Sequence, residues 1–207
     1  GILDTGCLDG LPDGVTAREI ATDETALQRL AELAPNGHPV SDLSMAAMTG
    51  GIVIEVSGAV AAPLMLLFEG GHADCSAHPA ILVSLAAGAH LQLAEWHQSG
   101  VGLSAPLIGV DVGPEARLEQ VKVQSEGADT THLAATGVAL AEKSSISGFS
   151  LSTGGALARL ETNVALLGKG ADCQLSAIYM GRGAQHQDIT TFTVSYTHLT
   201  LPTKNEV

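Results

Sequence analysis

Four stretches of this chain decide its fold: GAHLQLAE at residues 88–95, EARLEQVK at 115–122, KSSISGFS at 143–150 and GADCQLSA at 170–177. Each passes from a turn-like pair into a strand-like run, and their first residues are 27, 28 and 27 residues apart. A second strand-like run lies about halfway through each interval. Such a fixed period marks a repeat architecture, in which each coil buries its apolar face against its neighbours. Two strands per coil predict a parallel β-helix, although strands every ~8–12 residues also suit a β-sandwich.

Strand-like runs of the same kind occur on both sides of these stretches. Eleven short runs rich in Val, Leu, Ile or Thr follow Gly51, each bounded by turn-forming residues. The runs are Ile52–Val56, Leu64–Phe68, Ile81–Leu85, Ala89–Glu95, Leu107–Val112, Ala116–Val123, Leu133–Leu140, Ser145–Leu151, Leu157–Leu167, Ala171–Met180 and Asp188–Val194. We therefore expect a mainly β chain whose β-helix core spans residues 51–194.

Residues 1–50 read as a flank with short helices. Apolar residues share one helical face between Asp23 and Leu33, and a second short helix is expected from Ser41 to Met48. Thr16 and Glu19 have the spacing of a helix capping box, although a short strand could equally begin there.

Charge excludes two classes of partner. The chain has 207 residues and a formal net charge of −13, from 9 Lys+Arg against 22 Asp+Glu. Nucleic-acid and anionic membrane surfaces both require clustered positive charge, so we expect neither partner. No apolar run reaches the roughly 18 residues of a membrane span. The three cysteines, Cys7, Cys75 and Cys173, are widely separated without a CxxC pair, which predicts free thiols, a reducing compartment and a cytoplasmic protein.

No catalytic or metal-binding motif is present. The phosphate-binding loop GxxxxGK[ST] and the serine-hydrolase elbow GxSxG do not occur, and the eight histidines show no standard metal-ligand spacing. Glu95 and His97 should share one face of a strand, and we interpret them as a polar pair on the surface. We therefore expect no catalytic, cofactor-binding or metal-binding residues.

The most distinctive local group of polar residues is Gln185, His186 and Asp188. They follow a Gly-rich turn and enter a strand, on which His186 and Asp188 would share a face and could form a hydrogen bond. We interpret the three as a structural or interface motif that closes a coil.

Several segments of the chain carry a resemblance to a known family. They are Gly154–Val164, Leu167–Ala171, Tyr179, Gly183–Thr191, Ile52–Pro63, Leu66–Phe68 and His78-Pro79. Together they resemble the SufB/SufD family, scaffold proteins of the SUF iron–sulfur cluster assembly system, over about residues 11–194. The likeness is greater to SufD, because Leu93–His97 stands where a Cys-bearing turn is associated with SufB.

The resemblance implies a right-handed parallel β-helix and a non-catalytic scaffold that acts through a SufB-like paralogue and a SufC-like ATPase. The parent complex would assemble the iron–sulfur cluster, and this chain would bind none itself. The family's functional His segment and SufC-binding helices should lie beyond residue 194, so His186 does not inherit that role.

Residues 195–207 resemble translated sequencing-adapter sequence, and we expect a non-native tail there on a chain that is a fragment. The alternative function is a carbohydrate-active or other surface-binding β-helix. The chain has one Trp, two Tyr and three Phe, so it has few aromatic side chains on which sugar rings could stack.

Overall fold

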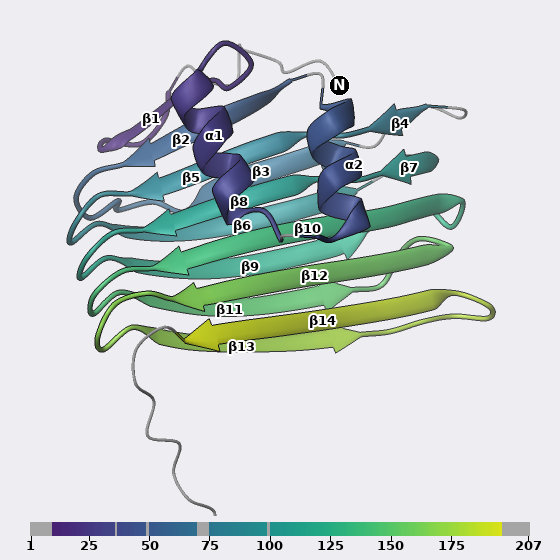
Figure 1. The fold of residues 1–207 in the computed structure, drawn as a ribbon. Coiled ribbons are helices and arrows are strands. Elements are labelled where there is room, and N and C mark those ends of the chain that lie inside the picture. Colours follow the sequence, from purple (N-terminus) through teal and green to yellow (C-terminus); the bar gives the residue numbers. More distant parts are fainter. Residues whose placement is uncertain (1–9, 36, 49, 70–74, 99, 196–207) are drawn as a thin grey trace, which may run out of the picture.

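The chain winds into a parallel β-solenoid of stacked coils in the computed structural model, which describes residues 10–35, 37–48, 50–69, 75–98 and 100–195. The predicted mainly β, parallel β-helix fold is confirmed (Figure 1). In chain order the elements are β1 (Val15–Glu19), α1 (Glu24–Leu33), α2 (Pro39–Ala47), β2 (Gly51–Val56), β3 (Leu64–Glu69), β4 (Ser76–Ala77), β5 (Ala80–Leu85), β6 (His90–Gln98), β7 (Gly102–Ser104), β8 (Leu107–Val112), β9 (Arg117–Ser125), β10 (Thr130–Leu140), β11 (Ser145–Ser152), β12 (Leu157–Leu166), β13 (Asp172–Tyr179) and β14 (His186–Ser195).

Two sheets form the walls of the solenoid. Among the described residues, sheet A follows the order β1-β2-β5-β8-β10-β12-β14, with the short strands β4 and β7 beside it, and sheet B follows β13-β11-β9-β6-β3. All pairs are parallel except β1 with β2. Successive coils therefore stack strand upon strand, which excludes the β-sandwich. The sequence pattern did not reveal β4 and β7, which have two and three residues.

The 27–28-residue period corresponds to one coil. Ala89, Ala116, Ser144 and Ala171 each stand immediately before a strand of sheet B, and the first two and Ser144 are almost completely buried. The amide after each of the last three positions donates to the carbonyl of the equivalent position in the preceding coil. The bonds are Arg117 N to Ala89 O at 2.8 Å, Ser145 N to Ala116 O at 2.9 Å and Asp172 N to Ser144 O at 2.9 Å. The predicted stacking on one sheet is confirmed.

The turns before these positions share one backbone conformation. Gly88, Glu115, Lys143 and Gly170 have φ values of 68°, 59°, 55° and 75°. Such left-handed values suit glycine and cost other residues roughly 1–2 kcal/mol. Glu115 and Lys143 therefore occupy strained positions that the stacked coils impose on them.

An apolar core fills the half of the lumen next to these turns. Ile108, Val110 and Val138 of sheet A pack in one buried cluster with Leu118 and Ile146 of sheet B. Their β-branched and leucine side chains repeat from coil to coil, so each level buries the one before it.

The two helices lie across the outer face of sheet A (Figure 1). Ala26 and Leu30 of α1 pack there in a second apolar cluster with Val53, Leu82 and Ala135. The side chain of Asp23 accepts a 2.9 Å hydrogen bond from Ala26 N and caps α1, as the predicted boundary suggested. The predicted second helix begins earlier than expected, because Pro39 suits its first turn.

Thr16 and Glu19 are not a helix capping box. They lie in β1, where Thr16 is paired with Glu55 and Glu19 with Ile52, because β1 can extend sheet A and a helix there could not. The predicted tail begins at the last residue of β14, and residues 196–207 lie outside the described residues. Cys7 also lies outside them.

Candidate functional site

Polar side chains fill the other half of the lumen. Glu95, His97, Lys122 and Gln124 occupy inward positions of β6 and β9 and are at most 5% exposed. Our interpretation of Glu95 and His97 as a surface pair is therefore wrong. The two residues do share a face, but that face is the inner one. This column of buried polar residues is the candidate functional site.

An ion pair between adjacent coils forms the centre of the column. Lys122 Nζ lies 3.2 Å from Glu95 Oε2 and donates to Thr136 Oγ1 across the lumen at 3.1 Å. The Gln120 amide donates to the other oxygen of Glu95. Burial alone raises the pKa of Glu95, but the Lys122 ammonium and the contact with His97 outweigh it and lower the pKa to about 2. Glu95 therefore carries its charge inside the protein.

Two buried histidines continue the column. The ring of His97 stacks on Phe68 with centroids 4.1 Å apart and meets the ring of His132 edge-on at 5.0 Å. Burial lowers the pKa of His97 against the opposing effect of Glu95, which favours the neutral imidazole. His132 Nδ1 lies 2.7 Å from Glu126 Oε2.

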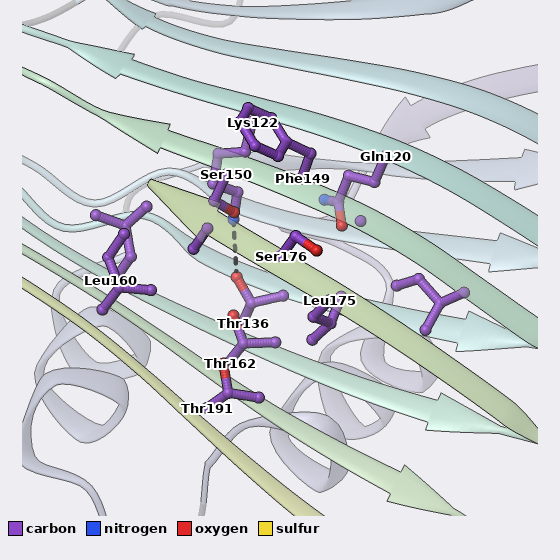
Figure 2. A pocket seen from close by; sticks show the side chains of 14 residues that line it. Gln120, Lys122, Thr136, Phe149, Ser150, Leu160, Thr162, Leu175, Ser176 and Thr191 are labelled. Carbon is purple, nitrogen blue, oxygen red and sulfur yellow. Dashed lines mark hydrogen bonds between the residues drawn. The ribbon is translucent and has the colours of Figure 1, made fainter. Parts of the chain in front are cut away.

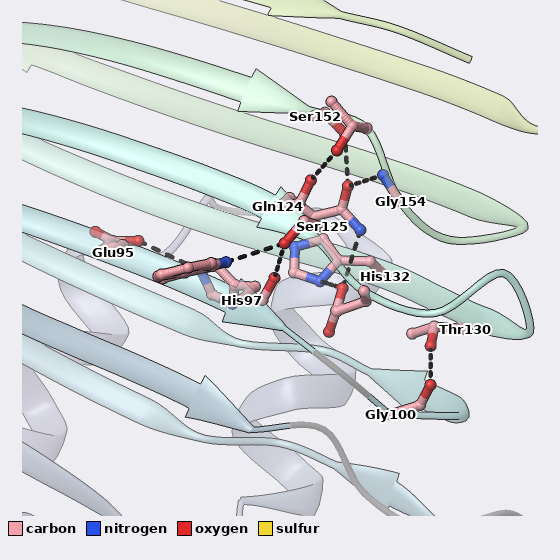
Figure 3. Close-up of polar contacts among 12 residues, drawn as sticks. Glu95, His97, Gly100, Gln124, Ser125, Thr130, His132, Ser152 and Gly154 are labelled. Atoms are coloured by element: carbon pink, nitrogen blue, oxygen red, sulfur yellow. Dashed lines mark hydrogen bonds and ion pairs between the residues drawn. The ribbon is translucent and has the colours of Figure 1, made fainter. Parts of the chain in front are cut away.

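Gln124 connects two adjacent coils of the solenoid (Figure 3). Its Oε1 accepts from Gly154 N at 3.1 Å and lies 2.9 Å from the hydroxyl of Ser152, while its Nε2 donates to Glu126 Oε2 at 3.1 Å. Gln187 Nε2 donates to Gly154 O at 2.8 Å, which extends the network to β14. A side-chain amide suits this position because it both donates and accepts.

A small cavity of about 70 Å³ opens beside the column, between the two sheets. Thr136, Thr162 and Thr191 stand in register on successive strands of sheet A and line one wall, while Lys122 and Gln120 line the other (Figure 2). Lys122 and Gln124 find partners within the column, whereas Nδ1 of His97 and Nε2 of His132 are buried without a hydrogen-bond partner. The ion pair holds charge in place, and Gln120, Lys122 and the three threonines present a polar wall to this cavity.

The described residues contain no group of three His, Cys, Asp or Glu side chains that could hold a metal ion. Within the same residues, no helix is long and apolar enough to cross a membrane.

Two residues of the predicted motif, His186 and Asp188, lie on the outer face of β14, and Gln185 lies in the turn before it. His186 is exposed, and its backbone amide donates to Ala156 O at 2.9 Å. The carboxylate of Asp188 lies 3.5 Å from Arg159 Nε and accepts from Thr190 Oγ1 at 3.0 Å, and Gln185 Oε1 accepts from Arg182 N at 2.8 Å. The three residues stabilise the turn into β14 separately, and their role at an interface stays a prediction.

The polar column was not predicted from the sequence, although the 27-residue spacing of its polar residues indicates it. Glu95 and Lys122 are 27 residues apart, as are His97 and Gln124. One coil therefore places each pair in register, and polar residues repeated at one position of the period would have indicated a column.

Comparison with known proteins identifies one family. The family model described as SUF system FeS cluster assembly, SufBD core domain, matches residues 68–200. No curated protein matches the chain.

Proposed function

The chain belongs to the SufBD family of the SUF iron–sulfur cluster assembly system, and on that premise we propose that it acts as a SufD-like scaffold subunit without catalysis of its own. One observation carries this proposal: the family match begins at the end of β3 and extends over the regular coils that contain the polar column.

The proposed partners are a SufB-like paralogue and a SufC-like ATPase in the cytoplasm. A SufD-like role is supported by β6, in which the segment Leu93–His97 contains no cysteine. A reducing compartment is supported by Cys75 and Cys173, which are free thiols in the structure. In this proposal the iron–sulfur cluster is the cargo of the complex, and this chain binds no cofactor itself.

A carbohydrate-active β-helix is not favoured. The family match points to cluster assembly. The single Trp of the chain, Trp96, donates its indole N–H to Ser125 Oγ at 3.0 Å instead of standing in an aromatic platform.

Co-expression with SufB-like and SufC-like proteins of one SUF operon tests the proposal. We expect a complex that contains all three chains, measured by size-exclusion chromatography with light scattering. The matched control replaces this chain by the SufD of the same operon. If that SufD enters the complex and this chain binds neither partner, the proposed role is wrong.

A further inference from the structure

The outer face of sheet B is apolar along the whole height of the solenoid. Alternation along a strand places one set of side chains in the lumen and the other outside. In the second half of β6, β9 and β11 the polar set points inward, so the apolar set points outward. In β3 both sets are apolar. The register aligns the outward set in two rows, Met65–Ala94–Val121–Phe149–Ser176 and Leu67–Trp96–Val123–Leu151–Ile178.

These two rows, here called the apolar face, are open to solvent. Met65 is 61% exposed, Leu67 50% and Ile178 51%, and Trp96, Val121 and Phe149 are also exposed. Their combined open area is roughly 500–600 Å², at the upper end of the largest apolar patch on a typical monomer. A contact that also covered the polar border would approach the ~800 Å² per partner of a stable interface.

The molecule already shows how its other sheet is covered. Both described helices pack on the outer face of sheet A, where α1 places Ala26 and Leu30 on Val53 and Leu82. Arg29 of α1 then pairs with Asp111 at the border, with Nε and Oδ2 2.9 Å apart. An apolar helix stripe with a basic residue beside it is thus the cover that this solenoid uses.

The apolar face also offers a hollow for anchoring side chains. A depression of about 460 Å³ lies over Ala94, Val121 and Phe149, where the small side chains of Ser147 and Ser176 leave room. Glu119 lines the same depression. Its hydrogen bond from Gln92 and the nearby Arg117 lower its pKa, so it is an anion at neutral pH.

Charge decides between the possible occupants. Glu69 and Glu119 stand at outward positions bordering the apolar face. Asp172 and Arg117 lie in the row beyond Glu119, and Arg117 pairs with Glu119 at 2.8 Å. The chain as a whole carries a net charge of −13. Like charge opposes association with a second copy and favours a partner with basic residues. We propose that the apolar face docks an amphipathic α-helix of a protein partner, with an aliphatic stripe in the depression and Lys or Arg beside the stripe. This inference rests on the geometry of sheet B and is independent of the proposed function.

Trp96 reports this docking directly, because it lies in the apolar face and is the only Trp of the chain. The probe is an 18-residue helical Leu/Lys peptide with one leucine stripe, titrated against the full chain. We expect a saturable blue shift of Trp96 fluorescence. A peptide of equal composition without the stripe, and a Leu/Glu peptide with it, should each bind at least tenfold more weakly.

The paired variant Val121→Asn/Phe149→Asn should weaken binding of the Leu/Lys peptide at least tenfold with no change in charge. The matched control, Phe192→Asn/Val194→Asn, removes two exposed apolar side chains from β14 of sheet A and should leave binding unchanged. Circular dichroism and urea unfolding verify that both variants fold. Equal weakening by both variants, equal binding of the Leu/Glu peptide, or a concentration-dependent dimer that buries Trp96 would each overturn the proposal.

Discussion

The ammonium of Lys122 lies 3.2 Å from the carboxylate of Glu95, directly beneath it in the next coil, and both side chains are enclosed by the solenoid. A buried ion pair costs free energy when its charges leave water, and it regains that energy only through good geometry and further hydrogen bonds. Here Thr136 and Gln120 supply those bonds. The pair therefore holds two adjacent coils in one register.

Breaking this pair should destabilise the protein strongly. Lys122→Met leaves Glu95 buried without its counter-ion, and we expect the free energy of unfolding in urea to fall by about 3–5 kcal/mol. The double variant Glu95→Leu/Lys122→Met removes both charges and should recover most of this loss. Arg117→Met, which breaks the exposed pair with Glu119, is the control and should change stability little. A similarly small effect of Lys122→Met would contradict the interpretation.

Stability should fall on acidification in two steps. Burial lowers the pKa of His97 in the folded state, so below about pH 6.5 the unfolded chain binds a proton that the folded chain resists. The pKa of Glu95 is about 2 in the folded state, against an ordinary value of 4.5. Its contribution is therefore complete above pH 4.5 and is lost as the pH falls toward 2.

Urea unfolding from pH 8 to pH 3 measures both steps. His97→Gln should reduce the first step and leave the second in place. Burial also lowers the pKa of His78, which accounts for a remaining part of the first step. The exposed His186→Gln is the control and should leave the profile unchanged. A first step that persists at full size in His97→Gln would assign it to another group.

Relieving the strained turns should stabilise the solenoid. Lys143 has φ of 55°, so Lys143→Gly removes the left-handed penalty and should raise the free energy of unfolding by up to ~1 kcal/mol. Glu142→Gly in the same turn provides the control, since Glu142 has no positive φ. That variant should destabilise the protein, because glycine gains flexibility in the unfolded chain. Stabilisation by both variants would show that φ is not the cause.

Close approach of α1 to sheet A should make Gly137 irreplaceable. A Cβ atom there would stand 1.7 Å from the backbone oxygen of Leu33. We expect Gly137→Ala to displace α1 and to speed hydrogen exchange of its amides while the strands stay protected. Gly50→Ala, whose Cβ would meet nothing within 4 Å, is the control. Unchanged exchange in Gly137→Ala would mean that the helix accommodates the methyl group.

Anaerobic incubation with iron and sulfide tests the proposed absence of a resident cluster. We expect no stoichiometric visible absorption from the isolated chain. A cluster that forms on the wild-type chain and is lost in His186→Ala would overturn the proposal and make His186 a ligand.

Periodicity and turn chemistry favoured the solenoid but left the β-sandwich open, and the family resemblance also implied a β-helix. The 27–28-residue spacing, the residues at its turns and the apolar spacing in α1 act through local geometry and nearest-neighbour stacking, which a single sequence displays. The strand Leu107–Val112 was predicted with its observed bounds. The segment that begins near Thr16 stayed ambiguous between a helix start and a strand. Its five residues form β1 because β2 is available to pair with them, and that pairing is not visible in the local sequence.

Only the tertiary structure decided which side of each strand faces the lumen. Alternation in a segment such as Leu93–Ala94–Glu95–Trp96–His97 defines two faces, and polarity suggests that the charged one is outside. Closure of the coil reverses that assignment: Glu95 and His97 face Lys122 and His132 inside, where each finds a partner, while Ala94 and Trp96 face outward. Burial of a charge depends on partners contributed by other coils, and those partners come together only when the coils stack.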